Sequence, residues 1–303
     1  MFKSLKKVAM TLSLVALITV PSLAEDDACL STTDISAKQV QKALAPLLGG
    51  AKVVKVSESP IDGLYEVVIE ARGKKIPIYV DCELKYLVSG EIIDIKARKS
   101  ITRERARELA KETIEENAKV LAKVLGKDKV EKLKKIAPDF VAKAKIVKIE
   151  NKPKPNLILG NPSAKTKIIL IEDPQCPACA MLHEEILKLL EKRKDIAFEV
   201  YLFPLEFHKY AEGISENIVC TKSLKEKQKI LHESFEAALK NDKRKLKSLS
   251  KPCADAKPSI EKSIEFGKNV KISGTPTIIF PHNVMISGAM KAETLEKIID
   301  ILK

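Results

Sequence analysis

The sequence predicts two folded domains, an α+β domain followed by an α/β domain, with a helical segment between them. A length of 303 residues is enough for about two domains. The spacing of apolar residues changes from mostly two near the N-terminus to three or four in the middle of the chain. A Pro-containing stretch at residues 151–156 then precedes an alternation of strand and helix patterns that runs to the C-terminus.

Composition narrows the class of protein further. Hydrophobic residues make up 45% of the chain, which excludes overall disorder. The totals of 11 Gly and 15 Pro exclude a collagen-like or low-complexity chain. The net charge of +13 is open to three interpretations: nucleic-acid binding, a membrane surface, or a solvated lysine-rich exterior.

Residues 1–24 have the pattern of a secretory signal peptide. Three lysines precede an apolar run at residues 8–20, and the small residues Ser22 and Ala24 follow it. We expect cleavage after Ala24; an uncleaved anchor is disfavoured because the run is shorter than the roughly 20 residues that span a bilayer. Loss of the three lysines lowers the net charge to +10. Export argues against a nucleic-acid partner, so we interpret the basic run 243–247 as a solvated helix face.

Residues 25–97 predict a small α+β domain. A helix follows Asp34, its expected N-cap, and Gly49 ends it. Alternating apolar residues then predict antiparallel strands, the last two at residues 86–89 and 91–96. A unit of roughly 70 residues is marginal alone, so we expect it to gain stability from a partner.

Residues 98–150 predict a helical linker. Ser100 begins a long segment with apolar residues every three or four positions, and Gly126 ends it. Two shorter amphipathic segments follow, one at residues 128–136 and one after Pro138. Charges of both signs fill the remaining positions, as in a solvent-exposed helix.

Residues 151–303 predict an α/β domain with a helical insertion at about residues 205–270. Its expected strands are residues 167–171, 198–203, 277–280 and 284–287. Helices follow the first of these strands and close the chain at residues 293–302. This order of elements is that of a thioredoxin-like domain.

Cys176 and Cys179 form a C-x-x-C motif directly after a strand and at the start of a helix. The helix N-terminus stabilises a thiolate, so Cys176 is the expected nucleophile and Cys179 the cysteine that resolves a mixed disulfide. Together with His183 the motif also fits three zinc ligands, but no second C-x-x-C completes a structural site, and we predict no metal and no cofactor. We interpret His183 as a helix-surface residue and Asp173 as an exposed carboxylate.

The segment Gly274-Thr275-Pro276-Thr277 precedes a predicted strand. Proline is tolerated at the first position of a strand, and a cis peptide bond before it would hold a tight turn. The signal is weak alone and becomes strong together with the C-x-x-C motif.

These motifs resemble the DsbC/DsbG family of periplasmic disulfide isomerases. The resemblance rests on the motif 176–179 with Leu182-His183-Glu184, on residues 201–204, on residues 273–277 and on residues 87–94. It implies a periplasmic homodimer, V-shaped, with an N-terminal dimerisation domain and an uncharged cleft between two thioredoxin-like domains. It also implies a cis bond before Pro276 and substrate binding at Thr275 and Pro276. Thr275, the residue before this proline, resembles that of the family's isomerase branch; the oxidase branch usually has an aliphatic residue at this position.

The resemblance implies a structural disulfide between Cys220 and Cys253 in the helical insertion. Two features depart from the family pattern: the long linker, and the pair Cys29 and Cys82. We prefer a disulfide that ties the N-terminal segment to the sheet through Cys29 and Cys82. An intersubunit bond and an auxiliary redox pair are the alternatives.

The sequence therefore predicts a thiol:disulfide interchange enzyme that isomerises or reduces incorrect disulfides in misfolded exported proteins. Such an enzyme needs an electron donor, for which the resemblance suggests a DsbD-like membrane reductase. A disulfide-introducing oxidase that uses the same two cysteines is one alternative. A non-enzymatic dimeric holdase chaperone is the other.

Overall fold

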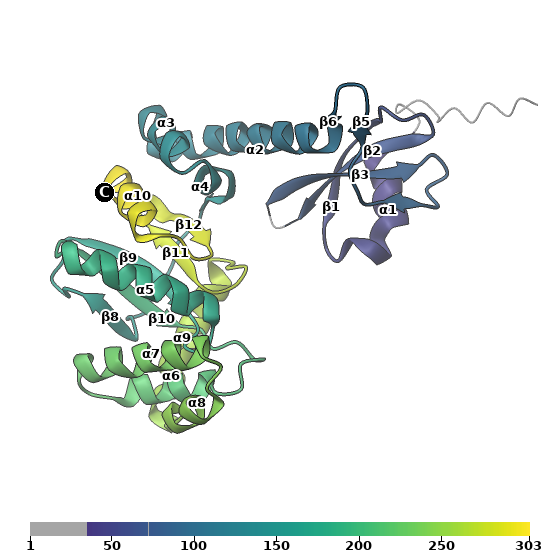
Figure 1. Cartoon of the computed structure of the whole chain (residues 1–303). Coiled ribbons are helices and arrows are strands. Elements are labelled where there is room, and N and C mark those ends of the chain that lie inside the picture. Colours follow the sequence, from purple (N-terminus) through teal and green to yellow (C-terminus); the bar gives the residue numbers. More distant parts are fainter. Residues whose placement is uncertain (1–34, 72) are drawn as a thin grey trace, which may run out of the picture. The chain divides into compact units, whose positions relative to one another are not determined.

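The computed structural model describes residues 35–71 and 73–303. The predicted signal peptide and Cys29 fall outside the described residues. The chain divides into two compact units: the residues up to Val68 with Ile78–Ser89, and Gly90–Lys303 with Ile69–Pro77 (Figure 1). No helix in the described part of the chain is long and apolar enough to span a membrane.

The N-terminal unit consists of one helix and a four-stranded sheet. Helix α1 (Ala37–Leu48) is followed by β1 (Lys52–Glu58), β2 (Leu64–Ala71), β3 (Lys74–Asp81) and β4 (Leu87–Val88), which pair in the order β1-β2-β3-β4. Ser36 caps α1: its hydroxyl accepts from the N–H of Gln39 at 3.3 Å, and the Gln39 side chain accepts from the N–H of Ser36 at 2.8 Å. The N-cap is therefore Ser36 and not the predicted Asp34. Gly49 ends the helix in the left-handed conformation with φ 52°.

The predicted strands at residues 86–96 are shorter in the structure. β4 and β5 (Ile93–Asp94) have two residues each, and β5 pairs with β6 (Lys99–Ser100) instead of joining the four-stranded sheet. The Asp94 carboxylate accepts from the N–H of Ala97 at 2.8 Å and so closes the turn between β5 and β6.

The helical segment consists of α2 (Ile101–Leu125), α3 (Lys127–Ile136) and α4 (Pro138–Lys143). Ser100 caps α2 by accepting from the N–H of Arg103 at 3.1 Å, and Gly126 separates α2 from α3 with φ 82°. The C-terminal half of the segment packs into the core of the α/β unit, where the rings of Phe140 and Phe280 meet edge to face at 5.6 Å. That half is therefore part of this unit and not a free linker.

The α/β unit is built on a six-stranded sheet of order β7-β12-β11-β9-β10-β8. Its strands are β7 (Lys145–Ile146), β8 (Leu157–Gly160), β9 (Thr166–Glu172), β10 (Ile196–Leu202), β11 (Thr277–Phe280) and β12 (Val284–Ser287). β9 and β10 are parallel, and β8, β11 and β12 are antiparallel to their neighbours. The prediction missed β7 and β8, which are short and flank the Pro-containing stretch.

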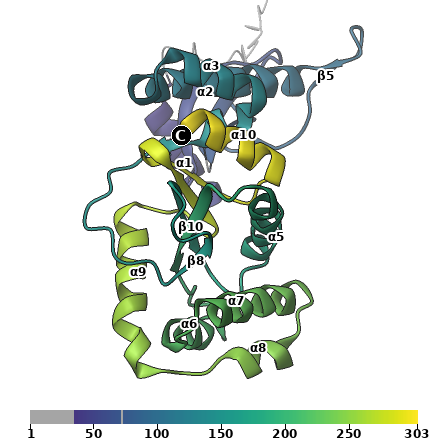
Figure 2. The same ribbon diagram turned by 90° about the vertical axis from the view of Figure 1, so that its left-hand side faces the viewer.

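Helices cover both faces of this sheet. α5 (Pro177–Lys192) and α10 (Ala292–Leu302) pack on one face, and α9 (Lys257–Asn269) packs on the other (Figure 2). The helical insertion follows β10 in the chain and ends before β11. It consists of α6 (Ala211–Cys220), α7 (Leu224–Leu239), α8 (Lys243–Leu249), the short 3₁₀ turn Ala254–Ala256 and α9. A second 3₁₀ turn, Pro281–Asn283, joins β11 to β12. The predicted fold class is confirmed.

Candidate active site

Cys176 and Cys179 lie where β9 ends and α5 begins. Cys176 is the N-cap residue of α5, with extended backbone angles, and Pro177 is the first helical residue, where its missing N–H is not needed. Both cysteines are free thiols; Cys176 is 7% exposed and Cys179 is fully buried. The strand, the motif and the helix are thus arranged as the sequence predicts.

The two thiols have opposite pKa shifts. The pKa of Cys176 falls to about 6, chiefly because the Cys179 side chain hydrogen-bonds to its sulfur, with further help from the backbone N–H groups of Cys179 and Ala178, while burial opposes the shift. Burial raises the pKa of Cys179 well above its usual value, and Cys176 raises it further. A pKa of about 6 makes Cys176 roughly 90% thiolate at pH 7. Cys176 is therefore the more reactive thiol of the pair at neutral pH, and Cys179 is a buried thiol.

The Thr275-Pro276 loop faces the motif. The Thr275–Pro276 peptide bond is cis, and the Thr275 carbonyl oxygen lies 3.6 Å from the Cys176 sulfur. Two hydrogen bonds fix the loop: the Pro276 carbonyl accepts from the N–H of Gly288 at 2.8 Å, and the Thr277 hydroxyl donates to the Gly274 carbonyl at 2.7 Å. The structure thus brings together residues that are about 100 positions apart in the chain.

Asp173 is fully buried, so its interpretation as an exposed carboxylate is wrong. Its oxygens accept from the N–H groups of Gln175 and Leu205 at 2.6 and 2.7 Å and bind Nδ1 of His208 at 2.9 Å. Burial raises its pKa, and these hydrogen bonds act in the opposite direction. Asp173 therefore ties the loop after β10 to the loop that carries Cys176.

The same loop after β10 places an aromatic side chain on the surface. Phe207 is 78% exposed, between the anchored residues Leu205 and His208. The backbone N–H of Tyr210 donates to the Gln175 side chain at 2.8 Å, which holds the other end of the loop. An exposed apolar side chain is thus fixed on a segment that is bonded to the residues before Cys176.

Glu172 is a titratable residue of the site that the sequence analysis did not single out. It is fully buried at the end of β9, and burial raises its pKa well above the usual value, followed by the charges of Cys176 and Asp173. A signal was present: residues 168–171 form a continuous apolar run, as in a strand that is buried on both faces, and Glu172 follows this run directly.

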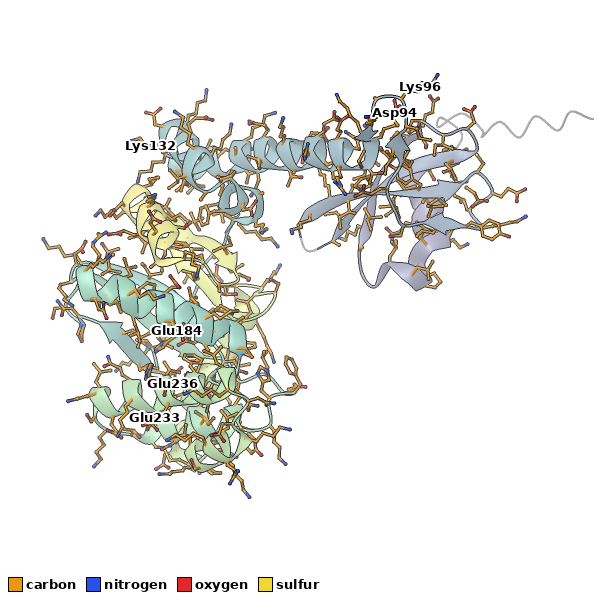
Figure 3. The ribbon with its side chains drawn as sticks, in the orientation of Figure 1. Asp94, Lys96, Lys132, Glu184, Glu233 and Glu236 are labelled. Carbon is orange, nitrogen blue, oxygen red and sulfur yellow. A yellow bond between two sulfur atoms is a disulfide. The ribbon has the colours of Figure 1, made fainter. Side chains whose placement is uncertain are left out.

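His183 is also buried, at 2% exposure, so its assignment to the helix surface is wrong. Its ring packs against Phe235 and His232 of α7, at centroid distances of 4.9 and 5.7 Å. Burial lowers its pKa to about 4. Glu184 of α5 and Glu236 of α7, both labelled in Figure 3, are exposed residues of these two helices. Within residues 35–71 and 73–303, no group of three His, Cys, Asp or Glu side chains is placed to hold a metal ion.

The structure joins Cys220 and Cys253 in a disulfide that links the end of α6 to the segment before α9. Nearby, the buried carboxylate of Glu216 accepts from the N–H of Cys253 at 2.8 Å. The Cys29–Cys82 pairing stays a prediction, because Cys29 is outside the described residues.

Two family models match the chain. The model described as "Disulfide bond isomerase protein N-terminal domain" matches residues 24–103, and the model described as "Thioredoxin-like domain" matches residues 157–303. Proteins named "Probable thiol:disulfide interchange protein DsbC" from Bordetella pertussis and Bordetella parapertussis are each 24% identical over 263 residues, which cover 87% of this chain and 74% of theirs.

Solved structures are similar to about half of the chain. A periplasmic thioredoxin-like protein from Salmonella enterica serovar Typhimurium is 18% identical with a TM-score of 0.44, and the match covers 50% of this chain and 91% of that protein. The catalytic domain of Proteus mirabilis ScsC is 20% identical with a TM-score of 0.41, at 51% and 93% coverage.

The fold and the two domain models agree with the family that the sequence motifs indicate. The chain joins a disulfide bond isomerase N-terminal domain to a thioredoxin-like domain and is a thiol:disulfide oxidoreductase similar to the proteins named DsbC.

Proposed function

We propose that this protein isomerises or reduces incorrect disulfides in exported proteins, with Cys176 as the nucleophile and Cys179 as the resolving cysteine. One observation carries the proposal: a thiol with a pKa of about 6 at a helix N-terminus lies beside a buried thiol whose pKa is raised. The thiolate is the reactive form in disulfide exchange, so the two cysteines differ in reactivity as this chemistry requires.

The reaction begins when the Cys176 thiolate attacks one sulfur of a substrate disulfide. A bond forms between Cys176 and that sulfur, the substrate S–S bond breaks, and the other substrate sulfur leaves as a thiolate. In isomerisation, a substrate thiolate then attacks elsewhere in the substrate and finally releases Cys176, so no electrons are gained or lost overall. In reduction, the Cys179 thiolate attacks the Cys176 sulfur, so that the Cys176–Cys179 bond forms and the Cys176–substrate bond breaks. The second substrate sulfur leaves as a thiolate, and the substrate is reduced by two electrons while the two cysteines are oxidised.

The Thr275-Pro276 loop binds the substrate in this proposal. Its carbonyl oxygen at Thr275, 3.6 Å from the Cys176 sulfur, lies at the right place to pair with an extended segment that carries the target disulfide. Phe207 and Met181, which are 78% and 51% exposed, supply apolar contacts for an unfolded segment.

The N-terminal domain supports two further proposals. We propose a homodimer, because the matching domain model is that of disulfide bond isomerases and the unit alone is small. We also propose a periplasmic location after cleavage of the signal peptide, with a DsbD-like membrane reductase that returns Cys176 and Cys179 to the dithiol form.

A disulfide-introducing oxidase is the second candidate, because the same two cysteines and the same lowered Cys176 pKa also serve the oxidation of a substrate. Stabilising the thiolate stabilises the reduced enzyme, which makes the Cys176–Cys179 disulfide more oxidising. The two functions differ in the resting redox state of Cys176 and Cys179. They also differ in the substrate: an isomerase or reductase acts on incorrect disulfides, and an oxidase acts on free thiols.

Refolding assays with scrambled and with reduced ribonuclease separate these functions. We expect the dithiol protein to restore activity to the scrambled substrate, and the Cys176→Ala variant to give only the uncatalysed yield. Equal yields with wild type and variant would contradict the proposal. If the disulfide form instead oxidises reduced ribonuclease rapidly and the dithiol form leaves scrambled ribonuclease unchanged, the oxidase is the correct function.

A further inference from the structure

The loop between β10 and α6, residues 203–210, is bonded to the segment 172–175 that leads into Cys176. Cys176 itself donates its N–H to the Asp173 carbonyl at 3.0 Å. The bonds from the loop are Phe203 N–H to the Glu172 carbonyl at 2.8 Å, Leu205 N–H and His208 Nδ1 to the Asp173 carboxylate at 2.7 and 2.9 Å, and Tyr210 N–H to the Gln175 side chain at 2.8 Å. The loop therefore has a fixed place next to the residues that carry the reactive thiol.

The Phe207 side chain in this loop has no role in the core. It is 78% exposed and belongs to neither apolar cluster of the described chain. Within residues 144–303, all of which the structure describes, the other exposed large apolar side chains are Met181 and Leu239, and both are less exposed than Phe207. Because no packing within the described residues explains this ring, its position indicates contact with another molecule.

His208 holds the Phe207 ring in place. The two rings meet edge to face, with centroids 4.5 Å apart and planes at 67°. His208 is fixed in turn, because its ring binds Asp173 and its N–H donates to the Leu205 carbonyl at 2.9 Å. A side chain that is already held in this way loses little conformational entropy when it binds a partner.

The small exposed area of Cys176 makes the surface around it part of the binding site. Cys176 is only 7% exposed, so a substrate that reaches its sulfur must also lie on the neighbouring segments. One neighbour is the Thr275 carbonyl, 3.6 Å from the sulfur, and the loop 203–210 is another. In an extended substrate segment, residues two to four positions from the target cysteine lie about 7–13 Å from it. Side chains close in sequence to the target cysteine are therefore the ones that can contact Phe207.

The charges on the loop favour an apolar occupant. Glu206 and Lys209 are exposed on either side of the pair Phe207-His208 and have opposite charges. The positive and negative side chains offset each other, so the loop does not select a substrate by its charge. The contact that distinguishes one substrate segment from another is the apolar one at Phe207.

We propose that Phe207 is a specificity-determining residue that binds a large apolar side chain within a few positions of the target cysteine, and that His208 is the residue that positions it. This inference rests on the proposed attack by Cys176. The preferred substrates are then disulfides whose cysteines lie in apolar segments, which a correctly folded protein keeps in its interior and a misfolded one exposes.

Peptides that carry one cysteine as a mixed disulfide with thionitrobenzoate test this contact. The Cys176 thiolate attacks the peptide sulfur; the Cys176–peptide bond forms, the peptide–thionitrobenzoate bond breaks, and thionitrobenzoate leaves as a coloured thiolate. Paired peptides differ only in Leu or Ser at one position, which is moved in turn from one to four residues on either side of the cysteine. At the best position we expect the Leu peptide to react about tenfold faster with wild type than the Ser peptide. Because the same thiolate attacks both peptides, this ratio does not depend on the reactivity of Cys176.

Variants of the loop assign the preference to the two residues. The ratio should fall to near one in Phe207→Ser and remain that of wild type in the matched control Leu239→Ser, which removes another exposed apolar side chain of the helical insertion. It should also fall in His208→Ala and be partly restored in His208→Asn, whose amide N–H can replace Nδ1 at Asp173. If His208→Ala does not fold, Phe207→Ser, which changes an exposed side chain, carries the test.

The outcomes that contradict the inference are distinct from those that contradict the enzyme's proposed function. A wild-type ratio near one at every position, or an unchanged ratio in Phe207→Ser, would overturn the role of Phe207. An unchanged ratio in folded His208→Ala would overturn the positioning role of His208. If wild type releases no thionitrobenzoate from either peptide, the role of Cys176 is wrong instead.

Discussion

Replacing Cys176 by Ala should abolish thiol–disulfide exchange, whereas replacing Cys179 by Ala should stop the reaction at the mixed disulfide. The reason is the difference between the two thiols. Cys176 is a thiolate at neutral pH, and Cys179 is fully buried with a raised pKa, so Cys179 cannot take over the first attack. Incubation with a disulfide-containing protein, followed by non-reducing electrophoresis and mass spectrometry, measures the trapped species.

The two variants control for each other, since each removes one sulfur from the same helix turn. We expect the Cys179→Ala variant to accumulate a covalent complex through Cys176 and the Cys176→Ala variant to form none. A complex that forms equally well through Cys179 in the Cys176→Ala variant would show that the order of attack is wrong.

Removal of the Cys220–Cys253 disulfide should destabilise the protein by roughly 3–4 kcal/mol on the chain-entropy account, since the bond closes a loop with a sequence separation of 33. The Cys220→Ala/Cys253→Ala variant should have its unfolding midpoint at a lower urea concentration, and the slope of its free energy of unfolding against urea concentration should be similar. The disulfide links the end of α6 to the segment before α9 and is separate from the thiols at α5. The Cys176 pKa should therefore be unchanged.

The matched control is the double variant Cys176→Ala/Cys179→Ala, which removes two thiols that form no disulfide in the described structure. Its free energy of unfolding should differ much less from that of wild type in which Cys176 and Cys179 are thiols and the Cys220–Cys253 disulfide is intact. If the Cys220→Ala/Cys253→Ala variant loses less than about 1 kcal/mol, the disulfide does not hold the helical insertion together in the way that the loop-closure argument requires.

The sequence predicted the elements whose signals are local. The apolar run before Cys176, Pro177 at the first helical position and the Thr275-Pro276 turn each identify their own element within a few residues. The family resemblance added the Cys220–Cys253 pairing, because sequence spacing alone leaves many pairings open.

The errors concern residues whose surroundings come from distant parts of the chain. Asp173 was assigned to the surface, but the loop around Leu205 and His208 covers it. His183 was assigned to the surface as well, but α7 places Phe235 over its ring. Burial of both residues depends on the helical insertion, which lies about 30 to 50 residues further along the chain, and no local pattern near Asp173 or His183 reports it.

The pH titration of the Cys176 thiolate tests the central claim most directly. The absorbance of the reduced wild type in the far ultraviolet, with Cys176→Ala as the blank, follows ionisation of this single thiol. The geometry predicts a midpoint near pH 6, because hydrogen bonds from Cys179 and the helix N-terminus stabilise the thiolate. A midpoint at about 8.5, the value of an unperturbed cysteine, would contradict the assignment of Cys176 as the activated nucleophile.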